Sequence, residues 1–378
     1  MKRYTCYIPL IVFLLYSCSQ DRQGGSGDLF EIAVDTNREN VLPLSEIAEK
    51  ITAVEMEMTD ESLINPEFIT RFIITENNII LFAMNFGSPS QVLVFNKDGK
   101  FVRSIGSKGQ GPREFNMIKN VAFDEKSKRI FILSGGPSKI ICYHLDGTFI
   151  KESRLSCDFS MDLNYINNEL FLYYEQTDKH TKSILLRMNE NFQITDSCII
   201  RDNYYEKGYI SMFFSKDYIV KNNTSIYFYS PEVYPKWLAP EVKVLRDTLY
   251  RIEDNHLVPE LKLKFKNDGF DSVGDKIIDL YNIFRSSRYV FAIYQINPNN
   301  TQRVLEHPKI FFFCYDTKTG KSYNMQDGFT DDINGIEKRV SIRPLHTNSE
   351  IFYYWHTNMK PDDPEEPNPT LYIIKLKK

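Results

Sequence analysis

The chain has 378 residues, of which 42% are hydrophobic and 14% aromatic, and its net charge is −4. This hydrophobic share is enough to build a core, so the composition excludes a chain too polar to fold. No basic patch stands out, so the sequence predicts no nucleic-acid partner.

The first 17 residues are predicted to be a secretory signal peptide. Lys2 and Arg3 precede an uncharged apolar run at 7–16. That run is shorter than the roughly 20 residues that a membrane-spanning helix needs. Residues 15–18, LYSC, resemble the lipobox of bacterial lipoproteins, although Tyr16 stands where a small residue is commoner. The resemblance implies that Cys18 is acylated and becomes the first mature residue. An ordinary signal peptide cut nearby and an uncleaved membrane helix are the alternatives.

Residues 18–28 are predicted to form a flexible tether because they are polar and rich in Gly and Ser. The folded domain is then expected over 29–378. A lipid bilayer is the expected partner of Cys18, and the expected location is the cell envelope. We expect an outer-membrane lipoprotein on the periplasmic or the surface face.

Four cysteines remain in the predicted mature domain: Cys142, Cys157, Cys198 and Cys314. They form no CxxC pair and no Cys/His cluster, so no zinc site is predicted. An oxidising compartment would permit disulfides. Three of the four, however, lie in apolar runs, and this favours free, buried thiols.

Strand patterns dominate the domain. Residues 43–50 predict a short helix and 51–58 a strand. Four runs rich in Ile, Val and Phe follow at 68–75, 79–84, 91–96 and 101–105. Short turn sequences such as Asp98-Gly99 separate them, which predicts one antiparallel sheet of four strands.

The last hairpin of this sheet recurs along the chain. The unit VLVFNKDGKFVRSIG (92–106) is echoed at 140–155, 184–200, 247–265 and 310–325. Equivalent positions (95, 143, 187, 251 and 315) lie 48, 44, 64 and 64 residues apart. Propeller blades repeat at about 40–50 residues, so the two later spacings require insertions. Within the insertion at 271–288, residues 275–284 predict a helix.

The two ends of the domain are expected to share a sheet. The strand at 371–376 has no return hairpin, and 51–58 can pair with it and close a ring without exposed edges. Five hairpins and this shared sheet predict an all-β fold, a six-bladed β-propeller closed by N- and C-terminal strands. A two-sheet sandwich is the alternative, but it predicts no repeated four-strand unit.

Four segments carry a resemblance to a known family: LSEIAEKITAVEMEM (44–58), FNKDGKFVRSIGSKGQGPREF (95–115), DTLYRI (247–252) and NPTLYIIKL (368–376). The chain thus resembles the six-bladed β-propeller lipoproteins of Gram-negative bacteria, which are related in shape to NHL-repeat propellers. The resemblance implies this fold over nearly the whole mature chain. It implies no catalytic residues.

The loop GSKGQGPREF (106–115) is the first candidate ligand site. It is not a P-loop, because Pro112-Arg113 stand where Lys and Ser/Thr are required. Arg113 and Glu114 could meet a ligand at the mouth of a central channel. With Arg103 and Lys108, Arg113 could attract an anion such as an acidic sugar. The alternative is that the loop only connects two sheets and that its charges are solvated.

The insertion at 201–245 is the second candidate. It holds Tyr204, Tyr205, Tyr227, Tyr229 and the stretch SPEVYPKWLAPEV (230–242) with Tyr234 and Trp237. A rigid aromatic loop can stack on a glycan or dock a protein partner. Otherwise these aromatic residues simply cap the edge of a sheet.

Paired carboxylates suggest an enzyme as an alternative. Asp331-Asp332 and the stretch MKPDDPEEPNP (359–369) are the densest acidic segments. They suit carboxylate chemistry or a calcium ion. No other cofactor is evident, no known catalytic motif occurs, and the catalytic residues stay unknown.

The sequence therefore predicts an exported, lipid-anchored binding or scaffold protein with an unknown ligand, and it leans against an enzyme. An envelope hydrolase or lyase with a carboxylate site in the channel is the alternative. Inward-facing Asp, Glu, Asn and His side chains would favour the enzyme, whereas an apolar plug would favour binding.

Overall fold

A computed structural model provides the structure of the chain. It describes residues 29–84, 90–136, 138–156, 159–177, 180–204, 217–232, 244–254, 256–272, 274, 276–297, 309–358 and 367–378. Almost all regular structure in these residues is β-strand. No helix among them is long and apolar enough to cross a membrane.

The first three sheets each contain four antiparallel strands in chain order. Sheet 1 comprises β3 (Ile69–Ile74), β4 (Asn78–Ala83), β5 (Gln91–Asn96) and β6 (Phe101–Ser104). Sheet 2 comprises β9 (Met117–Asp124), β10 (Arg129–Gly135), β11 (Lys139–His144) and β12 (Phe149–Arg154). Sheet 3 comprises β13 (Phe159–Ile166), β14 (Glu169–Thr177), β15 (His180–Met188) and β16 (Ile194–Tyr204). The strands and hairpins predicted over this half of the chain are confirmed.

The later sheets keep this pattern, and two of them add an N-terminal strand. Sheet 4 comprises β17 (Ile219–Asn222), β18 (Ser225–Phe228), β19 (Thr248–Glu253), β20 (His256–Phe265) and, parallel to β20, β1 (Phe30–Val34). Sheet 5 comprises β21 (Ile278–Arg285), β22 (Tyr289–Ile296), β23 (Lys309–Asp316) and β24 (Ser322–Gln326). Sheet 6 comprises β25 (Arg343–Leu345), β26 (Asn348–His356), β27 (Thr370–Leu376) and β2 (Ala48–Glu55). A short parallel pair, β7 (Ser107–Lys108) and β8 (Glu114–Phe115), lies between sheets 1 and 2 in the chain.

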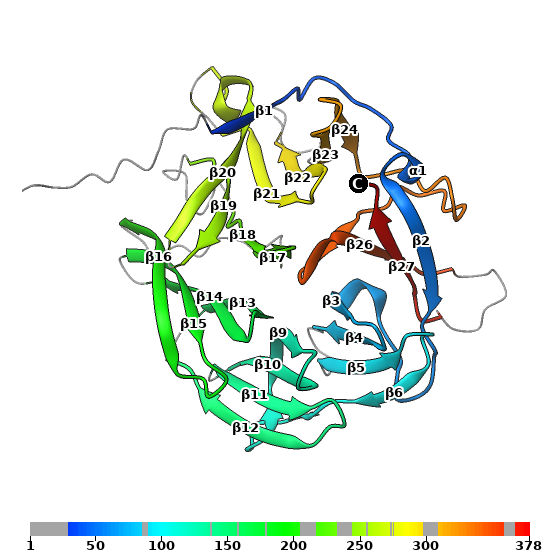
Figure 1. The fold of residues 1–378 in the computed structure, drawn as a ribbon, viewed down its shortest axis with the longest axis vertical. Helices are drawn as coiled ribbons and strands as arrows, with labels where there is room; N and C mark the ends of the chain where they lie inside the picture. Colours follow the sequence, from blue (N-terminus) through cyan, green and yellow to red (C-terminus); the bar gives the residue numbers. More distant parts are fainter. Residues whose placement is uncertain are drawn as a thin grey trace, which may run out of the picture.

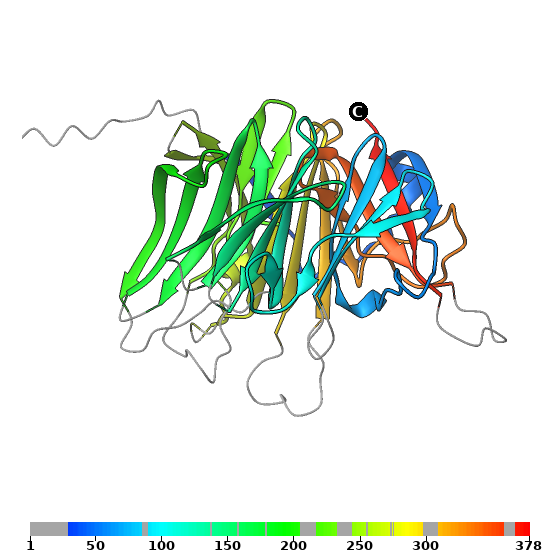
Figure 2. The same ribbon diagram turned by 90° about the horizontal axis from the view of Figure 1, so that it is seen from below.

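The sheets stand around a common centre like the blades of a propeller, as Figure 1 shows. The first strand of each sheet lies innermost, and several neighbouring first strands touch, such as β9 with β13 and β25 with β3. Seen from the side, the strands run between two faces of a thick disc (Figure 2). The first strands therefore surround the central axis.

Apolar layers join consecutive sheets. The described residues contain six buried hydrophobic clusters, one between each pair of consecutive sheets, including sheets 6 and 1. Each sheet is therefore buried on both faces, which explains continuous apolar runs such as 79–82 (IILF) and 130–133 (IFIL). Burial at about 25 cal/mol per Å² of apolar surface makes these layers the main stabilising term.

The N-terminal segment connects three sheets. After β1, the segment crosses the edge of sheet 5, where the amide of Asn40 donates to the carbonyl of Asn324 (2.7 Å). Helix α1 (Leu44–Ile47) follows, and β2 then pairs antiparallel with β27 from Ala48↔Leu376 to Glu55↔Thr370. The helix predicted at 43–50 is shorter than expected, because Ala48 already begins β2.

The helix predicted at 275–284 is wrong, because residues 278–284 belong to β21. Its apolar residues have helix-like spacing only because an inner strand is buried on both faces. Leu280 packs between sheets 4 and 5, and Phe284 packs between sheets 5 and 6.

Candidate functional site

Arg71 of β3 is the hub of a buried polar network on the central axis. Its side chain is 1% exposed, and Nη2 lies 2.8 Å from Asp162 Oδ1 and 3.4 Å from Asp217 Oδ1. Nη1 donates to Asn120 Oδ1 (3.0 Å). The network thus joins sheets 1, 2 and 3 to the residue that precedes β17 of sheet 4.

Arg343 of β25 extends the network to sheet 6. Its Nη2 lies 2.9 Å from Asp217 Oδ2, and its Nη1 donates to the carbonyl of Thr70 (2.8 Å). Asn282 of β21 donates to the carbonyl of Asp217 (3.0 Å). All six sheets therefore contribute to one set of buried contacts.

β-Bulges aim these side chains at the axis. The strand pairing shifts between Ile69 and Arg71, between Ser160 and Asp162, and between Leu280 and Asn282. An extra residue in one strand re-aims the side chain beside it. Polar residues inside largely apolar first strands were the sequence signal for this network, and our sequence reasoning missed it.

The arginines compensate the central carboxylates. Burial alone would raise the pKa of Asp217, but Arg343 and Arg71 hold it below its usual value. For Asp162 burial prevails and raises the pKa, despite the opposing charge of Arg71. Asp162 also accepts hydrogen bonds from Asn120 Nδ2 (2.8 Å) and the amide of Tyr218 (3.2 Å). Both carboxylate oxygens of Asp162 therefore accept hydrogen bonds from neighbouring parts of the ring of sheets.

His346 lies where β25 ends, and it is 1% exposed. Burial, followed by the charge of Arg71, lowers its pKa to about 3, so the imidazole is neutral near pH 7. Within the described ranges, neither ring nitrogen has a hydrogen-bond partner. The inward-facing Asp, Asn and His side chains that we associated with an enzyme are thus present, but arginines occupy both carboxylates.

A cavity of about 510 Å³, here called the central cavity, opens beside this network and is lined by residues of sheets 1, 5 and 6 and by Asp217. Its wall is apolar along sheet 5, where Phe284, Ile293 and Phe312 line it. Asp217, Asn282 and Arg343 connect it to the buried network. Three further lining residues, Lys338, Arg339 and Ser341, come from the connection that leads into β25.

Sheet 6 adds two further ring side chains to the cavity lining, Trp355 and His356. The indole Nε1 of Trp355 donates to the carbonyl of Pro66 (3.3 Å), and its ring lies 5.7 Å from that of Phe72. These contacts hold the indole against sheet 1. Burial, then Lys338, lowers the pKa of His356, so this side chain is neutral near pH 7.

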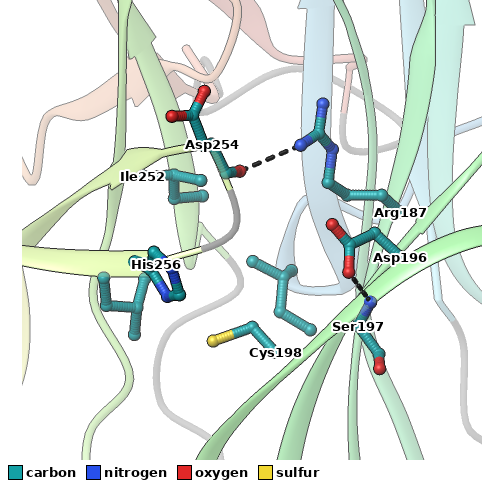
Figure 3. A pocket seen from close by; sticks show the side chains of 9 residues that line it. Arg187, Asp196, Ser197, Cys198, Ile252, Asp254 and His256 are labelled. Atoms are coloured by element: carbon teal, nitrogen blue, oxygen red, sulfur yellow. Dashed lines mark hydrogen bonds between the residues drawn. The ribbon is translucent and has the colours of Figure 1, made fainter.

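Two other hollows are less suited to a ligand. Figure 3 shows one between sheets 3 and 4, where Arg187 donates to the carbonyl of Asp254 (2.9 Å) near Cys198 and His256. Its volume is about 10 Å³, which is space for one water molecule. The other is an open surface groove of about 340 Å³ lined in part by Arg103 and Lys128. The central cavity is therefore the best candidate site.

The structure places Arg113 and Glu114 away from this cavity, in the loop that holds β7 and β8, and Arg113 packs against β12 of sheet 2. The guanidinium of Arg113 lies 4.8 Å from the ring centre of Phe149, and its amide donates to Glu152 Oε2 (2.9 Å). Glu114 Oε2 accepts from the amide of Gly111 (3.0 Å). Both therefore brace the loop between β6 and β9, which differs from the expected position at the channel mouth.

The aromatic insertion is only partly described. Tyr234, Trp237 and Tyr205 lie outside the described residues. We expected Tyr227 and Tyr229 on the surface. Instead they are only 7% and 2% exposed, and they lie in the layer between sheets 4 and 5. The alternation of β18 alone did not reveal that both of its faces are covered.

The acidic segments show no metal site where they are described. Asp331 accepts from Tyr354 Oη (2.6 Å), and Asp332 accepts from the amide of Ser45 (3.0 Å). The stretch 359–366 lies outside the described residues. Among the residues that the structure describes, no group of three His, Cys, Asp or Glu side chains could hold a metal ion.

Three cysteines in the described part of the chain have free thiols: Cys142, Cys198 and Cys314. Cys142 and Cys314 are fully buried, whereas Cys198 is half-buried. Cys157 and the predicted lipidation site Cys18 lie outside the described residues.

Several solved structures resemble this chain. A candidate exported protein from Bacteroides fragilis is 17% identical, with a TM-score of 0.58 over 92% of this chain and 99% of that one. A member of the DUF4221 family from Bacteroides vulgatus is 11% identical, with a TM-score of 0.46 over 87% and 97%. The β-propeller domain of the Trilobed protease from Pyrococcus furiosus is 12% identical, with a TM-score of 0.39 over 82% and 84%. The first likeness shows a shared fold.

No curated protein matches the chain. A family model does match: that of DUF4934, a domain of unknown function, over residues 29–375. This match covers far more than half of the sequence. The chain therefore belongs to the DUF4934 family.

Proposed function

We propose that this chain is an exported, lipid-anchored six-bladed β-propeller that binds a small ligand in its central cavity at the cell envelope. The six sheets and the apolar layers between them support six blades. The pairing of β2 with β27 supports closure by the two ends of the domain. The signal-like residues 1–17 and Cys18 support export and anchoring.

One observation carries the binding function: the cavity of about 510 Å³ beside the buried polar network. Ligand sites are commonly concave, largely apolar and between about 300 and 1,000 Å³, with a few polar groups that fix orientation. This cavity has an apolar wall on sheet 5 and polar groups from Asp217, Asn282 and Arg343. Its size suits a small molecule or the end of a glycan rather than a folded partner.

The hydrolase or lyase alternative has less support. A general acid or base needs a carboxyl group that can reach the substrate. Of the two central carboxylates only Asp217 lines the cavity, and Arg343 and Arg71 both contact it. The arrangement therefore favours binding over carboxylate catalysis.

Thermal unfolding of residues 19–378 with a panel of glycans and organic acids tests the proposal. A ligand at a hundredfold excess over its Kd adds about 2.7 kcal/mol of stability and raises Tm. We expect Ser341→Trp, which places an indole at the cavity, to abolish this shift. An equal shift in the variant, or no shift with any compound, would contradict the proposal. A shift with calcium that EDTA reverses would instead support the enzymatic alternative.

A further inference from the structure

We infer that the central cavity takes an amphipathic organic anion, a molecule with one acidic group and an apolar ring or chain. The inference rests on the proposed function and names the chemical class of its ligand. Two features of the cavity support this inference. One side has an apolar wall, and the other side has cations that have no carboxylate partner within the described residues.

The apolar wall is fixed in shape. Phe284 and Phe312 are 3% and 8% exposed and belong to the layer between sheets 5 and 6. The ring of Phe284 packs edge-on against that of Phe352 at 6.4 Å. Ile293 and Ile310 continue the lining. Such a wall binds the apolar part of a ligand by removing its surface from water.

The cationic side is formed by Lys338 and Arg339. Both side chains are exposed, and within the described ranges neither forms an ion pair with a carboxylate. Arg339 donates a hydrogen bond to the hydroxyl of Thr330. Asp217 is the one carboxylate among the described lining residues, and it contacts Arg343 and Arg71. Lys338 and Arg339 therefore remain available to an anion.

The charge balance of the described lining residues favours an anionic ligand over a cationic one. Among the described lining residues, three are cations (Lys338, Arg339 and Arg343) and one is an anion, Asp217. The net formal charge is therefore positive. A cavity of one sign with low-dielectric walls concentrates ligands of the opposite sign.

The cations sit on a segment that the fold holds in place. Phe329 and Val340 exchange two backbone hydrogen bonds of 2.9 Å each, so residue 340 is tied to the chain beyond β24. Ile336, Val340 and Ile342 are buried in the layer between sheets 5 and 6. Lys338 and Arg339 thus lie between buried anchors, which limits the cost of ordering them around a ligand.

Two fluorescent probes with nearly the same rings test the inference. 1-Anilinonaphthalene-8-sulfonate carries a sulfonate, whereas N-phenyl-1-naphthylamine is the neutral counterpart. We expect residues 19–378 to bind the sulfonate at least about tenfold more tightly at low salt. The difference should shrink towards 1 M NaCl, where the Debye length is about 3 Å.

Matched variants assign the charge effect to the two cations. Lys338→Gln with Arg339→Gln should reduce the preference for the sulfonate to about twofold or less and leave the Kd of the neutral probe unchanged. The control pair, Lys318→Gln with Lys321→Gln, removes the same charge from the exposed β23–β24 turn. It should keep the preference of the parent.

The outcomes separate the two claims. Equal affinity for both probes, lost in Ser341→Trp, would overturn the anion inference but leave cavity binding standing. No binding of either probe, or binding that Ser341→Trp leaves unchanged, would contradict the proposed function itself. Tighter sulfonate binding after Asp362→Asn with Asp363→Asn would also overturn the inference, because it would show that the chain's own carboxylates satisfy the cations.

Discussion

Arg71 shows how single residues determine the centre of this molecule. An unpaired buried charge costs several kcal/mol, so carboxylates on the axis need buried cations beside them. Arg71 contacts both Asp162 and Asp217, and Arg343 adds a second cation at Asp217. The network therefore holds neighbouring sheets together. Removing it should lower the stability of the fold more than it weakens ligand binding.

Arg71→Met should lower the free energy of unfolding by about 3–5 kcal/mol, because it leaves the buried Asp162 without its cation. Urea denaturation of residues 19–378 measures this loss. Arg103→Met is the control, since Arg103 is exposed and donates a hydrogen bond to the carbonyl of Asp146. The control should change stability by about 0.5 kcal/mol or less. A similar effect of both substitutions would contradict the bracing role.

Asp316, at the end of β23, gives the stability a pH dependence. Nε and Nη2 of Arg288 lie 3.0 and 2.7 Å from its two oxygens. The hydrogen bonds from Arg288 lower the pKa of Asp316 to about 2, against the opposing effect of burial. The unfolded value is about 3.9, so this carboxylate stabilises the fold fully above about pH 5 and loses its effect as the pH falls towards 2.

We therefore expect Asp316→Asn to be about 2 kcal/mol less stable than the parent between pH 5 and 7. The difference should disappear near pH 2, as measured by urea unfolding at each pH. A difference that stays constant over this range would show that the ionised carboxylate does not contribute in this way.

At the scale of the elements, hairpin turns connect neighbouring sheets. Gly99, in the β5–β6 turn, has φ +81°, and its carbonyl accepts from the amide of Glu57 just beyond β2 (2.9 Å). A Cβ at this position would lie 2.0 Å from the carbonyl oxygen of Glu55. The turn of sheet 1 thus sits directly against the N-terminal strand of sheet 6.

Gly147 offers a matched comparison, because it occupies the equivalent β11–β12 turn with φ +88°. Within the described part of the chain, no atom lies within 4 Å of the place that a Cβ would take there. Gly147→Ala should cost about 1 kcal/mol, the ordinary penalty of left-handed backbone. Gly99→Ala should cost at least about 2 kcal/mol more, because the clash is with backbone. Equal shifts in the midpoint of urea unfolding would contradict this close approach.

The hairpins were predictable because their signals are local. Asp98-Gly99 and Asp146-Gly147 mark turns by composition alone, and both turns carry a positive-φ glycine. The strand β21 was not predictable, since burial of both faces removed the alternation that identifies a strand. The parallel strand β1 was also missed, because it pairs with β20, more than 220 residues away.

Most of the candidate site could not be predicted from the sequence, for a related reason. The cavity takes Phe312, Lys338 and Trp355 from three separate segments. Only the fold brings these segments together, and no spacing rule connects them. Polar residues inside largely apolar first strands, such as Arg71 and Asn282, were the local sign of the centre.

At the scale of the whole molecule, the chain enters its folded domain at the outer edge of sheet 4. There β1 adds a fifth strand, and residues up to β2 then pass sheet 5 and reach sheet 6 (Figure 1). The proposed tether would therefore leave the domain from the rim, away from the cavity on the axis. In this arrangement an anchor leaves the site open to ligands.

Cys18→Ala tests the proposed anchor. A diacylated cysteine holds a protein on a bilayer through about 0.8 kcal/mol per buried methylene group. The variant should therefore move from the membrane fraction to the soluble fraction of the cells that express it, whereas Cys198→Ala should partition as the parent does. Unchanged membrane association of the Cys18 variant would contradict lipid anchoring.

A crystal structure of residues 19–378 with bound 1-anilinonaphthalene-8-sulfonate tests the central claim most directly. We predict density for the rings against Phe284 and Phe312, with the sulfonate towards Lys338 and Arg339. Density only in another place, such as the groove lined by Arg103 and Lys128, or an empty central cavity at saturating probe, would contradict the claim that this cavity is the binding site.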